Sequence, residues 1–156
     1  MRALKNLLTG SLLACVSIFS SHANAGVSHT VGGGVKLVAT KGTTSFYQGV
    51  TWQGTTRSVL FIRPTNLPAG KSAAIVMLHY DTGTPELQAN LAHAGDLAAK
   101  MGYWVILPPA INGHWHDDPS DTSTTTDDVG FLTQVIKTAT QQYPIDATRV
   151  AMAGLS

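Results

Sequence analysis

The second half of the chain alternates short apolar runs with segments of helical spacing. Three runs of strand length, Ala73–His79, Tyr103–Pro109 and Arg149–Leu155, consist almost entirely of apolar residues. Such runs are typical of parallel strands that are covered on both faces of a sheet. We therefore expect three buried strands in this part of the chain.

Helices are expected in the two intervals between these strands. Residues 85–102 carry apolar side chains at helical spacing, and Gly102 is placed to end that helix. A second helix is expected over residues 127–143, where Thr125 and Asp128 have the spacing of a capping box. The predicted apolar faces consist of Leu87, Leu91, Ala94, Leu97, Ala98 and Met101 in the first helix, and of Val129, Leu132, Val135, Ile136, Ala139 and Tyr143 in the second.

A β-hairpin is expected before these elements. Residues 45–64 contain two β-prone runs, with a Gly-Thr-Thr turn predicted at residues 54–56. The order strand, helix, strand, helix, strand that follows makes two right-handed βαβ units. The sequence therefore predicts an α/β fold, in which an antiparallel hairpin is followed by β-α-β-α-β parallel strands.

Residues that could carry chemistry follow each of the three predicted buried strands. These are His-Tyr-Asp at residues 79–81, the loop at residues 108–115, and Gly-Leu-Ser at residues 154–156. Ligands of open α/β sheets bind at the carboxyl ends of the strands. We therefore expect these three segments to lie together at one edge of the sheet.

Ser156 is the candidate nucleophile. A lone Gly-x-Ser is common, and an ordinary loop serine is its usual explanation. Here Gly154 and Ser156 follow a buried strand in a βαβ series, which is the context required of a nucleophile elbow, the sharp turn between strand and helix that exposes a catalytic serine.

The N-terminus has the pattern of a secretory signal. Arg2 and Lys5 precede an apolar stretch at residues 7–19, and Ala-Asn-Ala at residues 23–25 is typical of a signal peptidase site. We interpret residues 1–25 as a signal peptide, residues 26–44 as a Gly- and Thr-rich leader, and residues 45–156 as a partial catalytic domain. The apolar stretch is too short for a permanent anchor, and no later segment approaches about 20 apolar residues.

Cys15 leaves a second interpretation of the N-terminus open. "LLAC" resembles the site at which a lipoprotein cysteine is acylated, although the next residues, "VSIFS", continue the apolar run. Cys15 is also the only cysteine. Cleavage after Ala25 would therefore leave a chain without disulfides, stabilised by its core even in an oxidising compartment.

The charge of the chain argues against several partner classes. Without Arg2 and Lys5, 8 basic residues face 9 acidic ones, for a formal charge of −1, and no basic cluster is present. Nucleic acid is not an expected partner, and neither is an anionic membrane surface after signal cleavage. A neutral substrate is expected instead.

Four motifs together resemble a known group of enzymes. They are "VMLHYDTGT", "MGYWVILPP", "GHWHDD" and, most specifically, "TTDDVGFLTQVIKTATQQYPIDATRVAMAGLS". Their order is similar to that of the extracellular polyhydroxybutyrate depolymerases and feruloyl or acetylxylan esterases, a group of α/β-hydrolases, over about two thirds of the chain. The resemblance implies the N-terminal half of an α/β-hydrolase fold that hydrolyses an ester substrate, possibly a polymer, without a cofactor.

The resemblance also implies roles for individual residues. Ser156 would be the acyl-accepting nucleophile. The backbone N–H of Asp81, or else of Tyr80, would donate to the oxyanion, although Tyr80 lacks the conformational freedom of the glycine that the family has there. Trp115 would either stack on the acyl group of the substrate or cover the core.

Several polar residues have simpler explanations. His114, His116, Asp117 and Asp118 alternate imidazole and carboxylate, but a solvated loop explains them more readily than a metal site. His79 at a strand end is expected to pack the oxyanion loop rather than to act as a base. Residues 127 and 128, both Asp, suit the positive end of a helix dipole.

The residues that should activate the serine are missing from the sequence. In α/β-hydrolases the Asp or Glu and the His of the triad follow the serine, and no residue follows Ser156 here. We therefore expect this chain alone to be poorly soluble and inactive. Two alternatives remain: a secreted binding module that uses "GHWHDD" for carbohydrate or metal, and a catalytically dead α/β-hydrolase relative.

Overall fold

The computed structural model describes residues 34–116, 118, 120, 122 and 125–156. The predicted signal peptide and Cys15 lie outside these residues. The elements, in chain order, are β1 (Thr43–Trp52), β2 (Thr55–Pro64), β3 (Ser72–Leu78), α1 (Pro85–Leu91), α2 (Ala94–Met101), β4 (Trp104–Leu107), α3 (Asp128–Gln142) and β5 (Ile145–Gly154).

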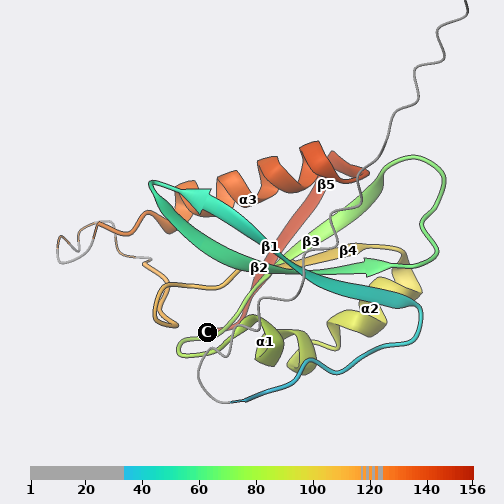
Figure 1. The fold of residues 1–156 in the computed structure, drawn as a ribbon, viewed down its shortest axis with the longest axis horizontal. Coiled ribbons are helices and arrows are strands. Elements are labelled where there is room, and N and C mark those ends of the chain that lie inside the picture. Colours follow the sequence, from blue (N-terminus) through green and yellow to red (C-terminus); the bar gives the residue numbers. More distant parts are fainter. Residues whose placement is uncertain (1–33, 117, 119, 121, 123–124) are drawn as a thin grey trace, which may run out of the picture. The chain divides into compact units, whose positions relative to one another are not determined.

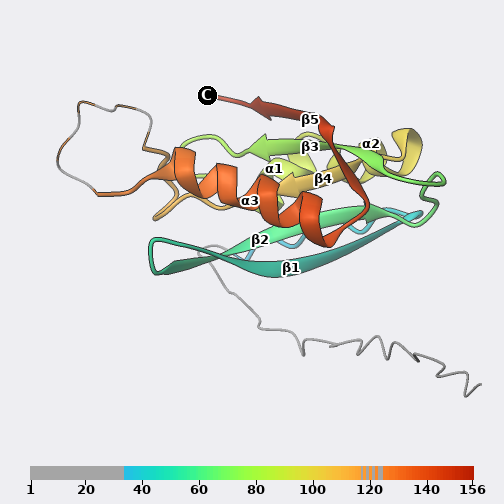
Figure 2. The same cartoon turned by 90° about the horizontal axis from the view of Figure 1, so that it is seen from above.

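The strands form one sheet in the order β1-β2-β4-β3-β5. β1 pairs with β2, and β2 with β4, in antiparallel fashion, whereas β3 is parallel to both of its neighbours, β4 and β5. Figure 2 shows β1 and β5 at opposite edges. The predicted fold class, a hairpin followed by β-α-β-α-β parallel strands, is confirmed.

The helices cover both faces of the sheet. α1 and α2 lie on one face and α3 on the other (Figure 1). The crossover from β3 to β4 and the crossover from β4 to β5 run in opposite directions along the sheet. Two crossovers of the same hand must then lie on opposite faces, as they do here.

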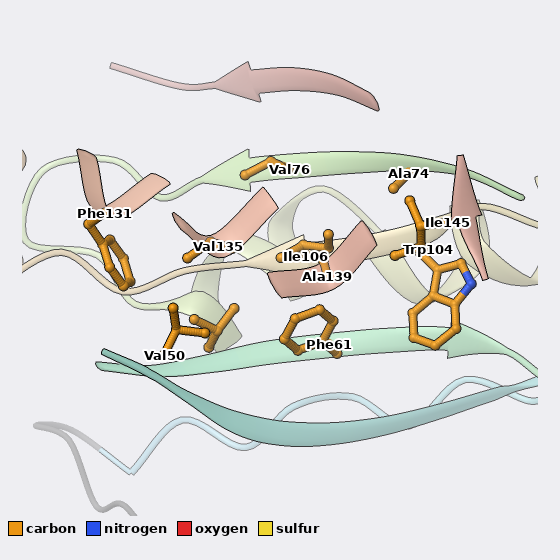
Figure 3. Packing of buried hydrophobic residues seen from close by; sticks show 11 residues of the cluster. Val50, Phe61, Ala74, Val76, Trp104, Ile106, Phe131, Val135, Ala139 and Ile145 are labelled. Carbon is orange, nitrogen blue, oxygen red and sulfur yellow. The ribbon is translucent and has the colours of Figure 1, made fainter. Parts of the chain in front are cut away.

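Two hydrophobic clusters hold these layers together. The α3 side is built on aromatic packing, in which Phe61 stacks on Phe46 with 5.3 Å between ring centroids and Trp104 stacks on Tyr143 at 4.9 Å. Figure 3 shows the buried side chains of this cluster between α3 and the sheet. The cluster under α1 and α2 consists of Leu60, Ile62, Met77, Ala89, Ala94, Ala98, Val105 and Leu107. Alternate residues of β2 and β4 thus point to opposite faces, as a central strand requires.

The hairpin turn differs from the prediction by its position. It consists of Gln53 and Gly54, with φ of 46° and 79°, and the two threonines predicted to be in the turn begin β2. A two-residue turn with both φ values positive matches the twist of the flanking strands. A glycine at the second position suits this geometry.

The first predicted helix is divided in two. α1 ends at Leu91 and α2 begins at Ala94, and His93 between them adopts a left-handed conformation with φ of 49°. This break changes which side chains face the sheet, so Leu91 and Met101, both predicted to be buried, are 56% and 55% exposed. The predicted stop at Gly102 is confirmed, with φ of 68°.

The start of α3 also differs from the prediction. Its N-cap is Asp127, whose carboxylate accepts the N–H of Gly130, and not Thr125. Val129, predicted on the apolar face, is 74% exposed. The stripe that packs on the sheet is instead Phe131, Val135 and Ala139, at i, i+4 and i+8.

β5 is longer and more exposed than predicted. It begins at Ile145, and beyond this buried residue only Asp146 and Val150 are even half-buried. Met152, in the predicted buried run, is 49% exposed. The cause is its place in the sheet, because among the described strands β5 pairs only with β3.

The segment before β1 is attached to α1. The Asn90 side chain accepts the N–H of Val38 at 2.9 Å and donates to the carbonyl of Lys36 at 3.0 Å. These two hydrogen bonds hold residues 36–38, which belong to the predicted leader, against α1. Within the part of the chain that the structure describes, no helix has the length and apolarity needed to cross a membrane.

Candidate functional site

The three predicted segments meet at the carboxyl ends of the parallel strands. The N–H of Asp81, after β3, donates to the carbonyl of Ser156, after β5, at 3.3 Å. The N–H of Thr82 donates to the carbonyl of Gly113, in the loop after β4, at 2.9 Å. The loops that leave β3 and β4 lead to helices on opposite faces, and this is where open sheets form ligand crevices.

The side chain of His79 connects the loop after β3 with the loop after β4. Its side chain is buried, its Nδ1–H donates to the carbonyl of Tyr80 at 2.8 Å, and its Nε2 accepts the N–H of Ala110 at 3.0 Å. Both ring nitrogens are thus occupied by backbone groups, which fixes the tautomer with the proton on Nδ1. His79 is a structural residue of the loop after β3, as expected, and has no nitrogen left to act as a base.

The loop after β3 is a tight turn over residues 80–83. The carbonyl of Tyr80 accepts the N–H of Gly83 at 2.8 Å, and Thr82 takes the positive φ of 61°. Tyr80 itself has no positive φ, so its side chain causes no backbone strain. Gly83 is constrained instead, because a Cβ there would lie 2.8 Å from the Tyr80 carbonyl oxygen.

Of the two predicted oxyanion donors, Asp81 is the one whose N–H faces Ser156. Its carboxylate accepts a hydrogen bond from Nδ1 of His114 at 2.6 Å, across to the loop after β4. The two side chains are 68% and 60% exposed, so this pair contributes little to stability. Its effect is local, because it adds a further contact between the two loops close to Ser156.

Trp115 packs against the end of β3. Its indole Nε1–H donates to the carbonyl of His79 at 2.9 Å, and the two rings lie 5.1 Å apart. The side chain is half-buried. These contacts fix the indole against the end of β3, and the role of Trp115 toward a substrate stays a prediction.

Ser156 has a positive φ, which is compatible with the nucleophile elbow that the sequence predicts. Its φ is 52°, a left-handed value that is uncommon for a serine and is found where a strand turns sharply. The residue is exposed, and within the described part of the chain its hydroxyl makes no hydrogen bond. Gly154 is less constrained, since a Cβ there would make only ordinary contact with Leu78 Cβ at 3.5 Å.

Sequence reasoning missed a buried ion pair beside the site. Asp128, assigned only to the helix dipole, is 4% exposed and pairs with Arg57 of β2, which is 8% exposed. A signal was present in the hairpin: Arg57 is in phase with Val59 and Phe61, on the face that forms the core. A charged residue at an inward position needs a buried partner.

The residues considered for a metal do not form a cluster. Among the described residues, no three His, Cys, Asp or Glu side chains gather closely enough to hold an ion. His114 is paired with Asp81, and Asp118 accepts hydrogen bonds from the N–H and hydroxyl of Ser120 at 2.8 and 2.6 Å. The hydroxyl and N–H bonds keep the pKa of Asp118 below its usual range. Asp117 lies outside the described residues.

Comparison with known proteins relates this arrangement to esterases by fold. No family model matches the sequence, and no curated protein matches it. A thermostable esterase from Pseudomonas putida ECU1011 is similar in structure, with a TM-score of 0.53 and 18% identity over 75% of this chain. A hyperthermophilic esterase from the archaeon Pyrobaculum calidifontis has a TM-score of 0.54 and 18% identity over 72% of this chain. An S-formylglutathione hydrolase from Agrobacterium tumefaciens has a TM-score of 0.55 and 14% identity over 78% of this chain.

The length of the chain differs from that of these proteins. The match covers 35% of each esterase and 52% of the S-formylglutathione hydrolase, so the chain spans about a third to a half of their length. At 14–19% identity the similarity is one of fold. The described part of the chain has the mixed α/β fold of the corresponding part of these hydrolases.

Proposed function

We propose that this chain is the nucleophile-bearing part of a secreted serine esterase, of the polyhydroxybutyrate depolymerase and feruloyl or acetylxylan esterase type. The observation that carries the proposal is the conformation of Ser156, which leaves β5 with φ of 52° while the Asp81 N–H points at its carbonyl. A serine in this position of an α/β-hydrolase fold suits the role of nucleophile.

The proposed reaction is acyl transfer in two steps. Ser156 Oγ attacks the ester carbonyl, and its proton passes to a histidine base and from there to the leaving alcohol, which departs as the C–O bond breaks. Water then attacks the acyl-serine, regenerates the hydroxyl and releases the acid. We assign the base and its carboxylate to the part of the protein that the solved esterases have and this chain does not span.

Oxyanion stabilisation is the second proposed role at the site. The negative oxygen of each tetrahedral intermediate would accept a hydrogen bond from the backbone N–H of Asp81. The side chain is not the donor, so the family's glycine and cysteine are not needed in this loop. In the structure that N–H donates to the main-chain oxygen of Ser156 at 3.3 Å, so it would exchange this acceptor for the oxyanion during the reaction.

The substrate class follows from the resemblance and from the charge. We propose a carboxylic ester of a polyhydroxyalkanoate or of plant cell walls, with no cofactor, and with Trp115 as a packed wall beside the acyl group. A chain without a basic cluster suits a neutral ester. Export is proposed from the charged, apolar and small-residue pattern of residues 1–25.

The proposal is tested by replacing the serine in the complete protein, translated from the whole gene. Ser156→Ala should lower the kcat for p-nitrophenyl butyrate by roughly 10⁶-fold, because the acyl-enzyme can no longer form. A fluorophosphonate should label the wild-type protein at Ser156, as found by mass spectrometry of the peptide. Ser45→Ala, at an exposed position on β1 far from the site, is the matched control. It should leave both the kcat and the fluorophosphonate labelling unchanged.

The 156-residue chain provides a complementary measurement. Its Ser156 hydroxyl has no histidine partner among the described residues, so an unassisted serine should give no measurable turnover. Turnover by this chain that disappears in Ser156→Ala would contradict our assignment of the base. A complete protein that keeps its activity as Ser156→Ala would end the proposal itself.

A further inference from the structure

The buried pair of Arg57 and Asp128 has contacts beyond its own ion pair. Arg57 lies on β2 with its guanidinium carbon 4.0 Å from the centre of the Phe131 ring, and Asp128 opens α3. A buried charge is tolerated when its remaining donors and acceptors are also satisfied. The partners that satisfy them show what the pair holds.

Both further partners belong to the same loop. Nη1 of Arg57 lies 3.5 Å from the carbonyl oxygen of Pro109, and Oδ2 of Asp128 accepts the backbone N–H of His116 at 2.7 Å. Pro109 and His116 are the two ends of the segment 109–116, which we name the Trp115 loop. The ion pair therefore holds this loop at both ends.

The Trp115 loop in turn holds the turn that faces Ser156. The N–H of Ala110 donates to His79, the carbonyl of Gly113 accepts the N–H of Thr82, and the indole of Trp115 donates to the carbonyl of His79. A Cβ at Gly113 would lie 3.1 Å from the Thr82 Cα, which shows how closely the two backbones approach. A shift of the loop must therefore be transmitted to the backbone around Asp81.

The neighbouring carboxylate separates this function from helix capping. Asp127 caps α3 through the N–H of Gly130 at 2.8 Å, and its other oxygen accepts the indole N–H of Trp52 at 2.9 Å. Asp128 is not needed for either contact. Each of the two aspartates thus uses both of its carboxylate oxygens. Asp127 binds the start of α3 and the hairpin, and Asp128 binds Arg57 and the Trp115 loop.

We propose that Arg57 and Asp128 are positioning residues that fix the Trp115 loop and, through it, the Asp81 N–H beside Ser156. The catalytic purpose of this arrangement rests on the proposed function. The positioning itself is a property of the folded chain and is measured without any substrate. The positioning and the proposed function can therefore fail separately.

The three tryptophans of the chain provide a direct measurement by NMR. Each indole N–H has a different environment: that of Trp52 is bonded to Asp127, that of Trp115 to the carbonyl of His79, and that of Trp104 is buried without a partner among the described residues. The experiment compares Asp128→Asn with Asp127→Asn in the complete protein, translated from the whole gene and labelled with ¹⁵N. An amide has one acceptor oxygen, so each variant loses one of two contacts.

The two variants should move different signals. Asp128→Asn should shift the Trp115 indole signal and raise the hydrogen exchange rates of the Ala110 and Thr82 amides by about tenfold relative to those of β2. Asp127→Asn should shift the Trp52 indole signal and leave the two amides within about twofold of wild type. The Trp104 signal should stay in place in both variants.

A general loss of stability would look different from loss of positioning. If Asp128→Asn raises exchange rates evenly across the sheet, or leaves the Trp115 signal and the loop amides unchanged, the proposal is wrong. If Asp128→Asn does not fold, Arg57→Met with Asp128→Leu replaces the pair by apolar side chains of similar size. A folded double variant should show the same local exchange, and a loop as protected as in wild type would overturn the proposal.

Discussion

Two Arg–Asp pairs in this chain have the same chemistry and different surroundings. Arg57 and Asp128 are buried, and they are 71 residues apart in sequence. Arg149 and Asp146 lie three residues apart at the start of β5, with Nε of Arg149 2.8 Å from the carboxylate, and their side chains are 54% and 30% exposed. The first pair joins β2, α3 and the Trp115 loop, whereas the second joins two residues within the first part of β5.

The difference shows that the value of an ion pair depends on what it holds and on how much water surrounds it. An exposed pair is screened by solvent and contributes little. A buried pair is costly to form, yet removing one partner leaves an uncompensated charge in the core. The same division separates two parts of the site: the His79 side chain is buried with both ring nitrogens bonded, whereas Ser156, after β5, is exposed.

Breaking the buried pair should have the largest effect on stability. Asp128→Ala leaves Arg57 without its counter-ion and should lower the free energy of unfolding by about 3–5 kcal/mol. The measurement is urea unfolding followed by circular dichroism. The double variant Arg57→Met with Asp128→Leu is the control and should recover most of that loss, because no buried charge remains. A double variant as unstable as Asp128→Ala would mean that the contacts to the Trp115 loop, rather than the charge, dominate.

Two glycines sharpen the same contrast at a smaller scale. Gly83→Ala, at the buried residue of the turn over residues 80–83, places a Cβ 2.8 Å from a backbone oxygen and should cost about 1–3 kcal/mol. Gly154→Ala, at the end of exposed β5, meets only Leu78 at 3.5 Å and should be neutral or stabilising by up to about 1 kcal/mol. Equal effects of the two substitutions in urea unfolding would show that β5 is as tightly packed as the turn.

Sequence reasoning found what local patterns encode. The apolar runs located β3 and β4, and a Gly-x-Ser at the end of the third run located Ser156 and its meeting with Asp81. The left-handed residue at His93 was not predicted, because helical spacing continues across the break. The partner of Asp128 was missed for a different reason: it lies 71 residues away, and a carboxylate at a helix start already had a sufficient local explanation.

The smallest expected effect is in the exposed pair and depends on pH. Hydrogen bonds from the hydroxyl and N–H of Thr148, followed by Arg149, lower the pKa of Asp146 from its usual value of 3.8 to about 2. A carboxyl group whose pKa is lower in the folded state contributes stability above its unfolded pKa and loses it as the pH falls through the folded pKa. The contribution of Asp146 should therefore be complete above pH 4 and disappear between about pH 4 and 2.

The Thr148 amide signal in an NMR titration of the folded chain reports this ionisation directly. Its shift should have a midpoint near pH 2, and Asp146→Asn should abolish the titration. A midpoint near 3.8 would mean that Thr148 and Arg149 do not hold the carboxylate in solution. In that case Asp146 would not stabilise the start of β5. The difference in stabilisation between this exposed pair and the buried pair of Arg57 and Asp128 would then be larger than the structure indicates.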